Sequence, residues 1–339
     1  MRIGITYDLR EEYLALGWSE QAVAEFDRAD TIDAIEHALA SLGHEADRVG
    51  GGSALMERLA RGDRWDLVLN IAEGRRGTGR EALIPALLDH HDIPYTFGDP
   101  LCCAVTLDKP TCKRVLASHG VPTPAMGVVA TLDDVDRLGL AFPVFAKPSR
   151  EGSSKGVNAA SVCRDAAQLR AVCASLLTEF NQPVLVETFL PGEEVTVGLV
   201  GTGDAARVVG VLGVGLTGGS EVYGYDDKEH CEEVVEYRLE TSAFARRASD
   251  LALAAYRAVG CRDAGRVDVR ADASGQPQVI EVNALAGLHP SHSDLPIMAG
   301  LAGWPYAELI EQIVASAATR VGGNGSCSPE ANEPERVTR

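Results

Sequence analysis

Two segments in which polar and apolar residues alternate, 265–271 and 278–283, constrain the fold of this chain more than any other feature. The turn sequence Asp-Ala-Ser-Gly at 272–275 separates them, so together they predict a β-hairpin. Successive side chains of a strand point to opposite faces, so each segment has one apolar face. The apolar faces carry Val267, Val269, Ile280 and Val282. Because these two faces can be buried together, the opposite faces remain open to solvent or to a ligand.

The polar face of this hairpin carries Asp268, Glu281 and Asn283, next to Arg266. Hard oxygen donors suit Mg²⁺, and a magnesium ion held by one or two carboxylates usually completes its shell with substrate phosphates. A hairpin with one solvated face is an equally common explanation. The small and polar run 284–293 follows the second strand, and ligands of such sheets bind where strands end in loops. This position favours a metal and phosphate site.

A second polar segment, the loop 149–156, follows a predicted strand that ends in Lys147. The Gly-Ser-Ser sequence at 152–154 offers backbone N–H groups and hydroxyls to phosphate oxygens, and the lysine ammonium neutralises charge. The loop does not match the Walker P-loop, and no Gly-x-Gly-x-x-Gly pattern follows the first strand. Taken alone, a Gly-Ser hairpin loop is more often structural than functional. Its function therefore depends on the residues around it.

The net charge of −18 restricts the partners of the chain. An acidic surface repels phosphate backbones and anionic lipids, so we expect no nucleic-acid or membrane partner. No window of about 18 apolar residues is present, and the N-terminus lacks the apolar stretch of a signal peptide. The eight cysteines show no CxxC pair, which is typical of free thiols in a reducing compartment. The sequence therefore predicts a cytoplasmic protein.

The length of 339 residues suggests two or three domains. Strand and helix signals alternate in the first hundred residues, as in a parallel sheet with covering helices. The predicted strands span 2–7, 66–72, 142–147, 157–163, 184–187, 195–200, 207–213, 265–271 and 278–283. The predicted helices span 29–42, 107–120, 166–180 and 242–259. Residues after 321 have the composition of a flexible tail.

Seven short motifs follow one another along the second and third parts of the chain. They are Leu107-Asp108-Lys109, Lys147-Pro148-Ser149-Arg150-Glu151-Gly152-Ser153-Ser154, 184–190, 191–197, 265–269, Glu281-Val282-Asn283 and Ser291-His292-Ser293. In this order they resemble the ATP-grasp superfamily and, within it, the D-alanine–D-alanine ligase family. Each motif alone is weakly specific, whereas seven in order are strongly specific. The likeness extends from about residue 66 to residue 315.

The resemblance implies an α/β and α+β protein with the three-domain ATP-grasp fold. Residues 1–100 would form a preATP-grasp domain with a parallel sheet, and residues 101–189 a central lid domain. Residues 190–321 would form the C-terminal catalytic domain, followed by the flexible tail 322–339. In this family ATP binds between the central and C-terminal domains together with Mg²⁺. Two magnesium ions are expected, with Mn²⁺ as the alternative ion.

The resemblance also assigns roles to residues of this sequence. ATP contacts are assigned to Lys109, Lys147, Glu187, Phe189, Leu190, Glu194 and Lys228, the last on a mobile loop that closes the site. Metal ligands are Asp268, Glu281 and Asn283. Catalysis is assigned to Arg266, the Gly287 backbone, Lys228 and Ser153, with Arg266 and Gly287 stabilising a tetrahedral intermediate. Amino-acid binding is assigned to Glu25, Ser153, His292 and Ser293.

Four departures from the family pattern all lie where the amino acids would bind. The loop 8–24 lacks the family's glycine pair, 70–74 replaces its His-Gly, Glu229-His230 replaces a tyrosine, and Asp294 replaces an apolar residue. Glu25 is the nearest match to an ammonium-binding acid, although an acid in the first turn of a helix explains it equally well. We therefore expect substrates other than two D-alanines. The added acids Glu73, Glu229 and Asp294 suit a cationic or hydroxyl-bearing substrate, whereas surface acids are the commoner explanation in so acidic a chain.

The predicted function is an ATP-dependent carboxylate–amine ligase that forms a dipeptide bond. Phosphorylation converts the carboxylate into an acylphosphate, whose good leaving group allows an amine to attack. An ATP-grasp kinase for a small carboxylate or alcohol is the alternative, and it has no use for Arg266 and Gly287 as oxyanion donors. A nucleotide-binding regulatory protein is a third hypothesis. The expected partners are small-molecule amino acids and, in a homodimer, a second copy of the chain.

Overall fold

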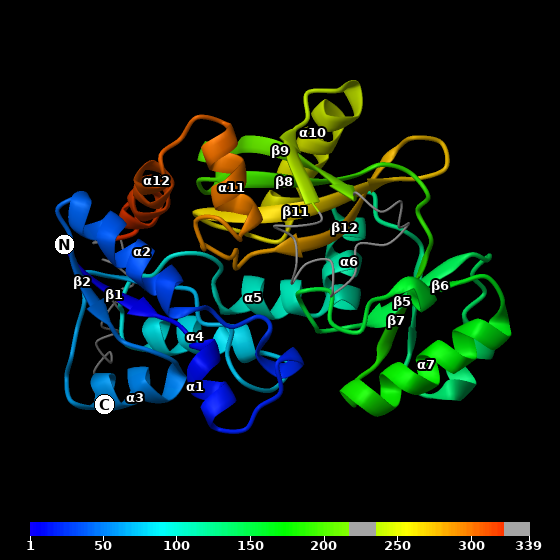
Figure 1. The fold of residues 1–339 in the computed structure, drawn as a ribbon, viewed down its shortest axis with the longest axis horizontal. Helices are drawn as coiled ribbons and strands as arrows, with labels where there is room; N and C mark the ends of the chain where they lie inside the picture. Colours follow the sequence, from blue (N-terminus) through cyan, green and yellow to red (C-terminus); the bar gives the residue numbers. More distant parts are fainter. Residues whose placement is uncertain (217–234, 322–339) are drawn as a thin grey trace, which may run out of the picture.

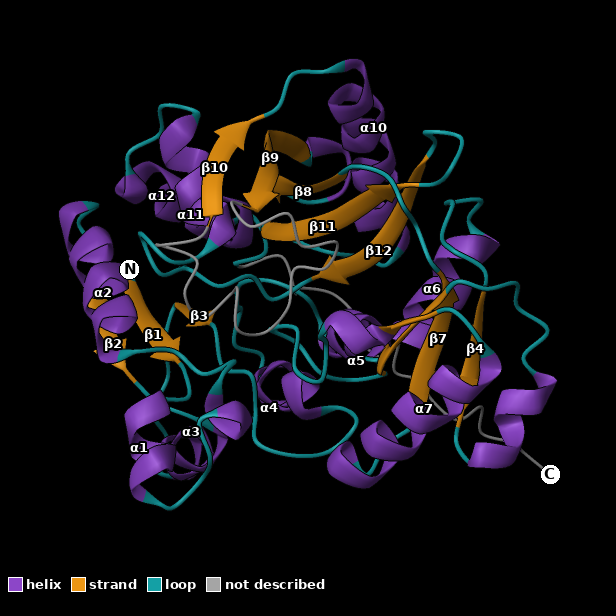
Figure 2. Cartoon of the chain, turned by 45° about the vertical axis from the view of Figure 1, so that its right-hand side comes forward, coloured by secondary structure: helices purple, strands orange, loops and turns teal. Residues whose placement is uncertain are grey.

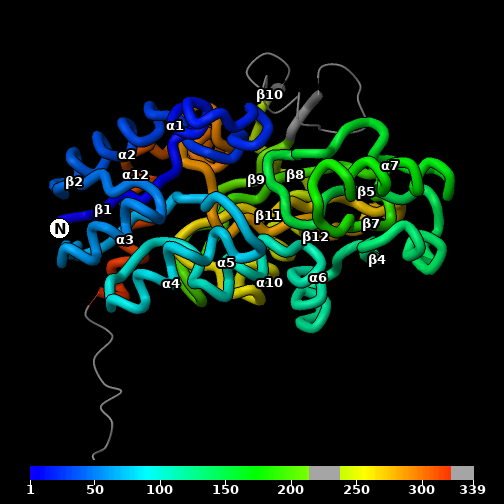
Figure 3. The backbone as a smooth tube through the Cα atoms, turned by 90° about the horizontal axis from the view of Figure 1, so that it is seen from below, coloured from blue at the N-terminus to red at the C-terminus, as the bar shows by residue number. Residues whose placement is uncertain are grey.

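A computed structural model describes residues 1–216 and 235–321, and its strands form three separate sheets (Figure 1). The predicted loop lysine, Lys228, and the predicted tail 322–339 lie outside the described residues. Figure 3 shows the N-terminal and central segments at opposite ends of the molecule, with the C-terminal strands between them. Within the described ranges, no helix is long and apolar enough to cross a membrane.

The N-terminal sheet is parallel, as the alternating strand and helix signals predict. Its strands, in the order β2-β1-β3, are β1 (Arg2–Thr6), β2 (Glu45–Arg48) and β3 (Leu67–Asn70). Its helices are α1 (Arg10–Ala15), α2 (Ala29–Ser41), α3 (Gly52–Ala60) and α4 (Leu83–His90). All four residues of β3 are buried, which explains its continuous apolar run. The sequence analysis misses β2 because the sequence Glu-Ala-Asp-Arg carries no apolar alternation.

The central sheet is antiparallel throughout. Its strands, in the order β4-β7-β5-β6, are β4 (Met126–Val129), β5 (Val144–Pro148), β6 (Val162–Cys163) and β7 (Val184–Thr188). Its helices are α5 (Pro100–Leu107), α6 (Lys109–Ser118) and α7 (Ala166–Phe180). The predicted helix 166–180 is confirmed, because the Asp165 side chain caps it and Asn181 ends it in the left-handed conformation.

The predicted strand 157–163 is wrong except at its last two residues. Residues Ala159–Ser161 form a 3₁₀ turn instead, and Asn158 and Ser161 exchange hydrogen bonds as a capping box. Short polar side chains that bond to nearby backbone compete with a strand ladder. The other 3₁₀ turns are Gln21–Val23, Arg80–Ala82, Leu132–Arg137 and Gly203–Ala205.

The C-terminal sheet has five antiparallel strands in the order β10-β9-β8-β11-β12 (Figure 2). They are β8 (Glu194–Val200), β9 (Arg207–Leu216), β10 (Val235–Leu239), β11 (Ala264–Ala271) and β12 (Pro277–Asn283). Helix α10 (Ala243–Ala258) packs on β8, β11 and β12, while α11 (Asp294–Leu301) packs on β8, β9 and β10. Helix α12 (Tyr306–Ala318) packs on α2 and joins the C-terminal segment to the N-terminal sheet.

The predicted hairpin is confirmed, but one of its residues faces the other way. Asp268 pairs with Glu281 and Val267 with Val282, after which the register shifts and Val269 pairs with Val279. The extra residue is Ile280, so the prediction that Ile280 belongs to the buried apolar face is wrong. Val279 is fully buried in its place. Such a β-bulge turns one additional side chain toward the other face of the sheet.

Asp263 joins three parts of the chain although no part of its side chain is exposed. Its carboxylate accepts hydrogen bonds from the backbone N–H of Phe97 at 2.8 Å and from the hydroxyl of Ser316 at 2.8 Å. Both guanidinium Nη atoms of Arg320 also donate to it, at 2.8 and 2.6 Å. The buried negative charge therefore depends on one arginine at the end of α12.

We expect Arg320→Ala to lower the free energy of unfolding by about 3 kcal/mol, because Asp263 would remain buried without its cation. Denaturant-induced unfolding followed by circular dichroism measures this loss. Arg61→Ala is the matched control, since Arg61 forms a surface ion pair with Glu57 and both side chains are about 70% exposed. Its loss should stay below about 1 kcal/mol. Equal losses in the two variants would contradict the assigned role of Asp263.

Candidate functional site

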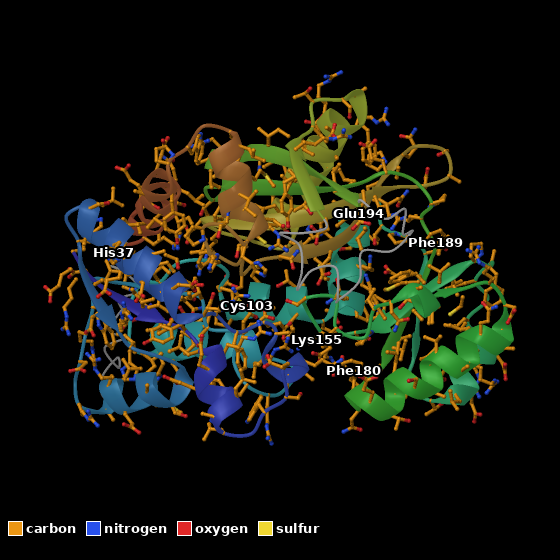
Figure 4. All side chains as sticks on the ribbon, in the orientation of Figure 1. His37, Cys103, Lys155, Phe180, Phe189 and Glu194 are labelled. Atoms are coloured by element: carbon orange, nitrogen blue, oxygen red, sulfur yellow. The ribbon has the colours of Figure 1, made fainter. Side chains whose placement is uncertain are left out.

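A cavity of about 350 Å³ is lined by residues of all three segments of the chain. Every predicted site residue that the structure describes lines it. These residues are Glu25, Lys109, Lys147, Ser153, Glu187, Phe189, Leu190, Glu194, Arg266, Asp268, Glu281, Asn283, Gly287, His292 and Ser293. Figure 4 labels Phe189 and Glu194 where the chain passes from the central to the C-terminal sheet, and Lys155 nearer the N-terminal segment. Residues distant in sequence thus converge on one site.

The polar face of the hairpin forms one wall of the cavity. The Asp268 carboxylate accepts a hydrogen bond from the Asn283 amide at 3.0 Å and another from the Thr196 hydroxyl at 2.8 Å. The Glu281 carboxylate lies 2.7 Å from the ammonium of Lys109. Among the described residues no group of three His, Cys, Asp or Glu side chains could hold a metal by itself. The third donor here is an amide, and this oxygen set fits Mg²⁺.

A buried cluster of two lysines and one glutamate adjoins the cavity, which Lys147 and Glu187 line and Lys113 does not. The Glu187 carboxylate is 2.6 Å from the ammonium of Lys113 and 3.0 Å from that of Lys147. Burial raises the pKa of Glu187, but the two lysines outweigh it and hold that pKa below its usual value. Burial likewise lowers the pKa of Lys147, yet Glu187 and Glu281 raise it overall. Lys147 therefore stays charged beside the cavity.

Apolar and cationic side chains form the end of the cavity near the junction of β7 and β8. Leu190 is buried, and the Arg270 guanidinium lies 5.3 Å from the centre of the Phe189 ring. The same guanidinium is 3.0 Å from the Glu194 carboxylate. The bulged residue Ile280 also lines this cavity. A planar heterocyclic ring with polar edges would suit this end of the cavity.

An ion pair and a hydrogen bond hold the first residues of the loop 149–156. The Arg150 guanidinium lies 2.7 Å from the Asp108 carboxylate, and Lys109 donates to the carbonyl of Glu151 at 2.5 Å. Ser153 and Ser154 adopt φ values of 47° and 53°, which non-glycine residues rarely adopt. Backbone strain of this kind persists where surrounding structure enforces it and is common in ligand-binding loops.

Glu25 attaches this loop to the N-terminal segment. Its carboxylate accepts from the Gly152 N–H at 2.6 Å and lies 2.7 Å from Lys155 and 3.2 Å from Arg80. The helix-turn explanation of Glu25 is wrong, because α2 begins only at Ala29. Burial raises its pKa, but Arg80 and Lys155 lower it below the usual value. The ammonium-binding role of Glu25 remains a prediction, and the structure adds two cations that already contact it.

Arg266 faces the cavity beside the metal-type donors. Its Nε is buried without a hydrogen-bond partner in the described part of the chain, and the Asp294 carboxylate lies 3.5 Å away. Burial disfavours its charge, but Asp294 and Asp268 raise its pKa overall. Because this Nε makes no hydrogen bond to a described residue, its N–H is available to an anion in the cavity. Asp294 also lines the cavity, beside this guanidinium.

Gly287, His292 and Ser293 lie together in the turn that precedes α11. The Ser293 hydroxyl accepts from the backbone N–H of His289 at 3.0 Å, and a Cβ at Gly287 would crowd this hydroxyl. The rings of His289 and His292 meet edge to face at 5.9 Å. Only glycine leaves the backbone at this position accessible from the cavity.

Three acids from the N-terminal segment, Asp27, Glu73 and Glu81, line the cavity, and the Glu81 carboxylate lies 4.0 Å from the Arg80 guanidinium. Burial and Asp8 raise the pKa of Asp27 to about 8, and burial and Glu25 raise that of Glu81 to about 7. Burial and Glu81 raise the pKa of Glu73 well above its ordinary value. Glu73 is thus a cavity residue, as the departures from the family pattern suggest.

We expect Asp27→Asn to flatten the pH dependence of stability. A raised pKa means that the folded state holds the proton more tightly than the unfolded chain. The stability from this proton is present below about pH 4 and is lost as pH rises through about 8. Asparagine cannot ionise, so the variant should exceed the parent protein by about 1–3 kcal/mol at pH 9. Unfolding at pH 5 and pH 9 measures this, with the exposed Asp133→Asn as control. Parallel pH profiles of Asp27→Asn and the parent would contradict it.

Residues that the sequence analysis missed include Lys113, Lys155 and Arg270. A lone lysine in a sequence is usually solvated, so nothing in the local pattern separates Lys113 and Lys155 from surface lysines. Only Arg270 carried a signal, because it shares a strand face with Asp268. The six cysteines that the structure describes are free, as predicted, and all six are buried.

Known proteins similar to this chain agree on one family. The model of the family "D-ala D-ala ligase C-terminus" matches residues 117–315. A D-alanine–D-alanine ligase of Bordetella petrii is 35% identical over 294 residues, which cover 85% of this chain and 86% of that protein. An "uncharacterized protein" of Sinorhizobium fredii is 32% identical over 312 residues, which cover 86% of this chain and 89% of that protein.

Solved structures show the same fold. A D-alanine–D-alanine ligase of Bacillus anthracis complexed with ATP has a TM-score of 0.72 at 22% identity, covering 96% of this chain and 100% of that one. The VanG D-Ala:D-Ser ligase of Enterococcus faecalis has a TM-score of 0.70 at 19% identity, covering 93% and 99%. The predicted ATP-grasp fold is thereby confirmed.

Proposed function

The chain belongs to the D-alanine–D-alanine ligase family of ATP-dependent ligases, and on that premise we propose that it joins two amino acids through an acylphosphate. One observation supports this proposal most: the buried Arg266, whose Nε lacks a hydrogen-bond partner among the described residues, shares a cavity wall with the oxygen donors. A phosphoryl-transfer site needs the oxygen donors, whereas only acyl transfer also needs an oxyanion donor beside them.

In this proposal each group of cavity residues binds a different part of ATP or the metal. Lys109 and Lys147 neutralise charge on the phosphates of ATP, and Phe189 and Leu190 hold the base between the central and C-terminal sheets. Glu187 and Glu194 bind the adenine and ribose. Asp268, Glu281 and Asn283 would hold Mg²⁺, one or two ions, with Mn²⁺ as a substitute. The metal supplies charge neutralisation at the transferring phosphoryl group.

Bond formation follows phosphoryl transfer. The carboxylate of the first amino acid attacks the terminal phosphorus of ATP, which gives ADP and an acylphosphate. The amine of the second amino acid then attacks the acyl carbon, and the resulting oxyanion binds Arg266 and the Gly287 N–H. Collapse of this intermediate forms the amide and releases phosphate. Ser153, His292 and Ser293 would bind the amino acids, as would Glu25, and Lys228 would assist from the segment outside the described residues.

The substrates proposed for this chain differ from two D-alanines. The sequence departs from the family pattern at Glu73 and Asp294, and both side chains line the cavity. Acids that line a cavity favour a substrate with a cationic or hydroxyl-bearing group, because such a group would supply hydrogen bonds or charge to them. Stereochemistry is left to experiment. The relative VanG, named as a D-Ala:D-Ser ligase, is a fold neighbour with a substrate other than two D-alanines.

Other expectations remain predictions. The boundaries at residues 100, 189 and 321 are proposed as domain boundaries, and each of the three proposed domains then contains one sheet. A cytoplasmic location, the absence of nucleic-acid partners and a homodimer are also proposed. Membership of a ligase family does not favour the alternative, an ATP-grasp kinase.

A phosphate-release screen tests the function. The protein is mixed with ATP and Mg²⁺ and with D- and L-amino acids, singly and in pairs, including basic and hydroxyl-bearing ones. We expect ADP and phosphate only when suitable amino acids are present, and mass spectrometry should find the dipeptide. Release of ADP that stays unchanged across the whole panel would contradict a ligase.

A further inference from the structure

Lys113 lies behind the nucleotide end of the cavity and does not line it. It is the fifth residue of α6, and its side chain is only 2% exposed. A lysine is rarely this buried unless its charge is paired. Nothing in the sequence distinguishes Lys113 from the surface lysines, and the proposed chemistry gives it no task. Its contacts must therefore explain why a charge is retained there.

The ammonium of Lys113 contacts three elements of the fold. It lies 2.6 Å from the Glu187 carboxylate of β7, 2.9 Å from the hydroxyl of Thr123 and 3.2 Å from the carbonyl of Val279 on β12. The Val279 N–H in turn donates to the carbonyl of Pro122 at 2.9 Å. The ammonium donates hydrogen bonds to Thr123 and Val279, and its contact with Glu187 is an ion pair. Lys113 thus joins the central sheet to the strand that carries Glu281 and Asn283.

Lys113 also determines how the Glu187 carboxylate pairs with its two neighbouring cations, Lys113 and Lys147. With Lys113 present, one carboxylate oxygen is paired with it, and the other is 3.0 Å from Lys147. Without Lys113, the buried carboxylate would have Lys147 as its remaining cation at short range. A single lysine would then have to neutralise both Glu187 and the phosphates.

Glu187 lines the cavity as an ionised carboxylate, which only accepts hydrogen bonds. An acceptor-only group selects a base that presents an N–H donor, such as the exocyclic amino group of adenine. It disfavours a base with a carbonyl oxygen at the same position, because two acceptors would face each other.

We propose that Lys113 is a positioning residue of the nucleotide site, which fixes Glu187 as the acceptor for the adenine amino group and keeps Lys147 available to the phosphates. This inference rests on the proposed function in one respect, namely that the nucleotide is ATP. Lys113 acts through Glu187 and Lys147, and it touches neither the nucleotide nor the amino acids.

Equilibrium binding of ATP and of ITP, with Mg²⁺ and without amino acids, tests the inference. ITP carries a carbonyl oxygen where ATP carries the amino group. Lys113→Met should weaken ATP binding by about 10- to 100-fold, the equivalent of losing one charged hydrogen bond. The preference for ATP over ITP should fall toward one. Thr123→Val is the matched control, because it removes another hydrogen bond of Lys113 but leaves the ion pair with Glu187. This variant should keep the parent protein's preference for ATP over ITP.

A double-mutant cycle covers the case in which Lys113→Met folds poorly. Lys113→Met combined with Glu187→Gln removes both buried charges, and this pair should bind ATP no more weakly than Glu187→Gln alone. A parent-like ATP preference in Lys113→Met, or a further loss in the double variant beyond Glu187→Gln, would overturn the inference. If the parent protein bound ATP but these results failed, only the inference would fall. If the parent bound no ATP at all, the proposed function would fall with it.

Discussion

Arg266→Met lowers kcat by about 100- to 1,000-fold in this account, while the affinity for ATP stays close to that of the parent protein. The guanidinium is buried on β11, its Nε has no hydrogen-bond partner among the described residues, and it lies beside Asp268. It can therefore donate to an oxyanion that forms only during acyl transfer. Methionine keeps the length and apolar stem of the side chain but removes every donor. Steady-state kinetics together with equilibrium binding of ATP separate the two effects.

Arg238→Met is the control for this experiment. Arg238 lies on β10, its side chain is 73% exposed, and it pairs with Glu240 outside the cavity. We expect parent-like turnover from it. An Arg266→Met enzyme with full turnover would contradict the oxyanion role and would favour a kinase, because phosphoryl transfer alone creates no tetrahedral acyl intermediate.

Asp268→Asn should have the second large effect. Its carboxylate is fixed by hydrogen bonds from Thr196 and Asn283, so it presents its charge at one place in the cavity. An amide of the same shape removes that charge, which is worth several kcal/mol at a site for a divalent cation and phosphates. We expect kcat/KM to fall by about 100- to 1,000-fold and the Mg²⁺ concentration for half-maximal rate to rise.

Asp272→Asn is the control that separates loss of a metal ligand from loss of hairpin stability. Asp272 lies in the turn between β11 and β12, where its carboxylate accepts from the N–H groups of Ser274 and Gln276. Its loss weakens the turn without touching the cavity. The Mg²⁺ dependence of Asp272→Asn should equal that of the parent protein. An unchanged Mg²⁺ dependence in Asp268→Asn would show that this carboxylate is no metal ligand.

Local patterns predicted the elements whose side chains alternate regularly. Strand β11 has a regular alternation of buried side chains, helix α7 has a side-chain cap at Asp165, and both lie where the sequence places them. The sequence patterns did not predict the irregular features, and the reasons are physical. The bulge at Ile280 breaks the period of two that the prediction assumes, and β2 is held by backbone pairing with β1 although its residues are polar. The capping box at Asn158 replaced a predicted strand through short side-chain bonds.

The residues of the candidate site likewise fall into those that the sequence predicts and those that it does not. The order of the motifs allowed us to predict that Lys147, Glu187 and Asp268 share one site, and all three line the cavity. The prediction was possible because the resemblance extends over the sheets that carry them. Partners fixed by long-range contact were not predictable. Lys113 meets Val279, 166 positions away in the sequence, and Lys155 meets Glu25 across 130 positions. No local pattern encodes such pairs, since they depend on how separate sheets pack.

Transfer of a carboxylate oxygen to phosphate tests the central claim most directly. The amino acid that serves as acyl donor, once the screen identifies it, is labelled with ¹⁸O in its carboxylate and incubated with ATP, Mg²⁺ and the second amino acid. Attack of the carboxylate on ATP moves one labelled oxygen into the phosphate that amide formation releases. We predict inorganic phosphate with one ¹⁸O atom for each dipeptide formed. Dipeptide accompanied by unlabelled phosphate would contradict an acylphosphate.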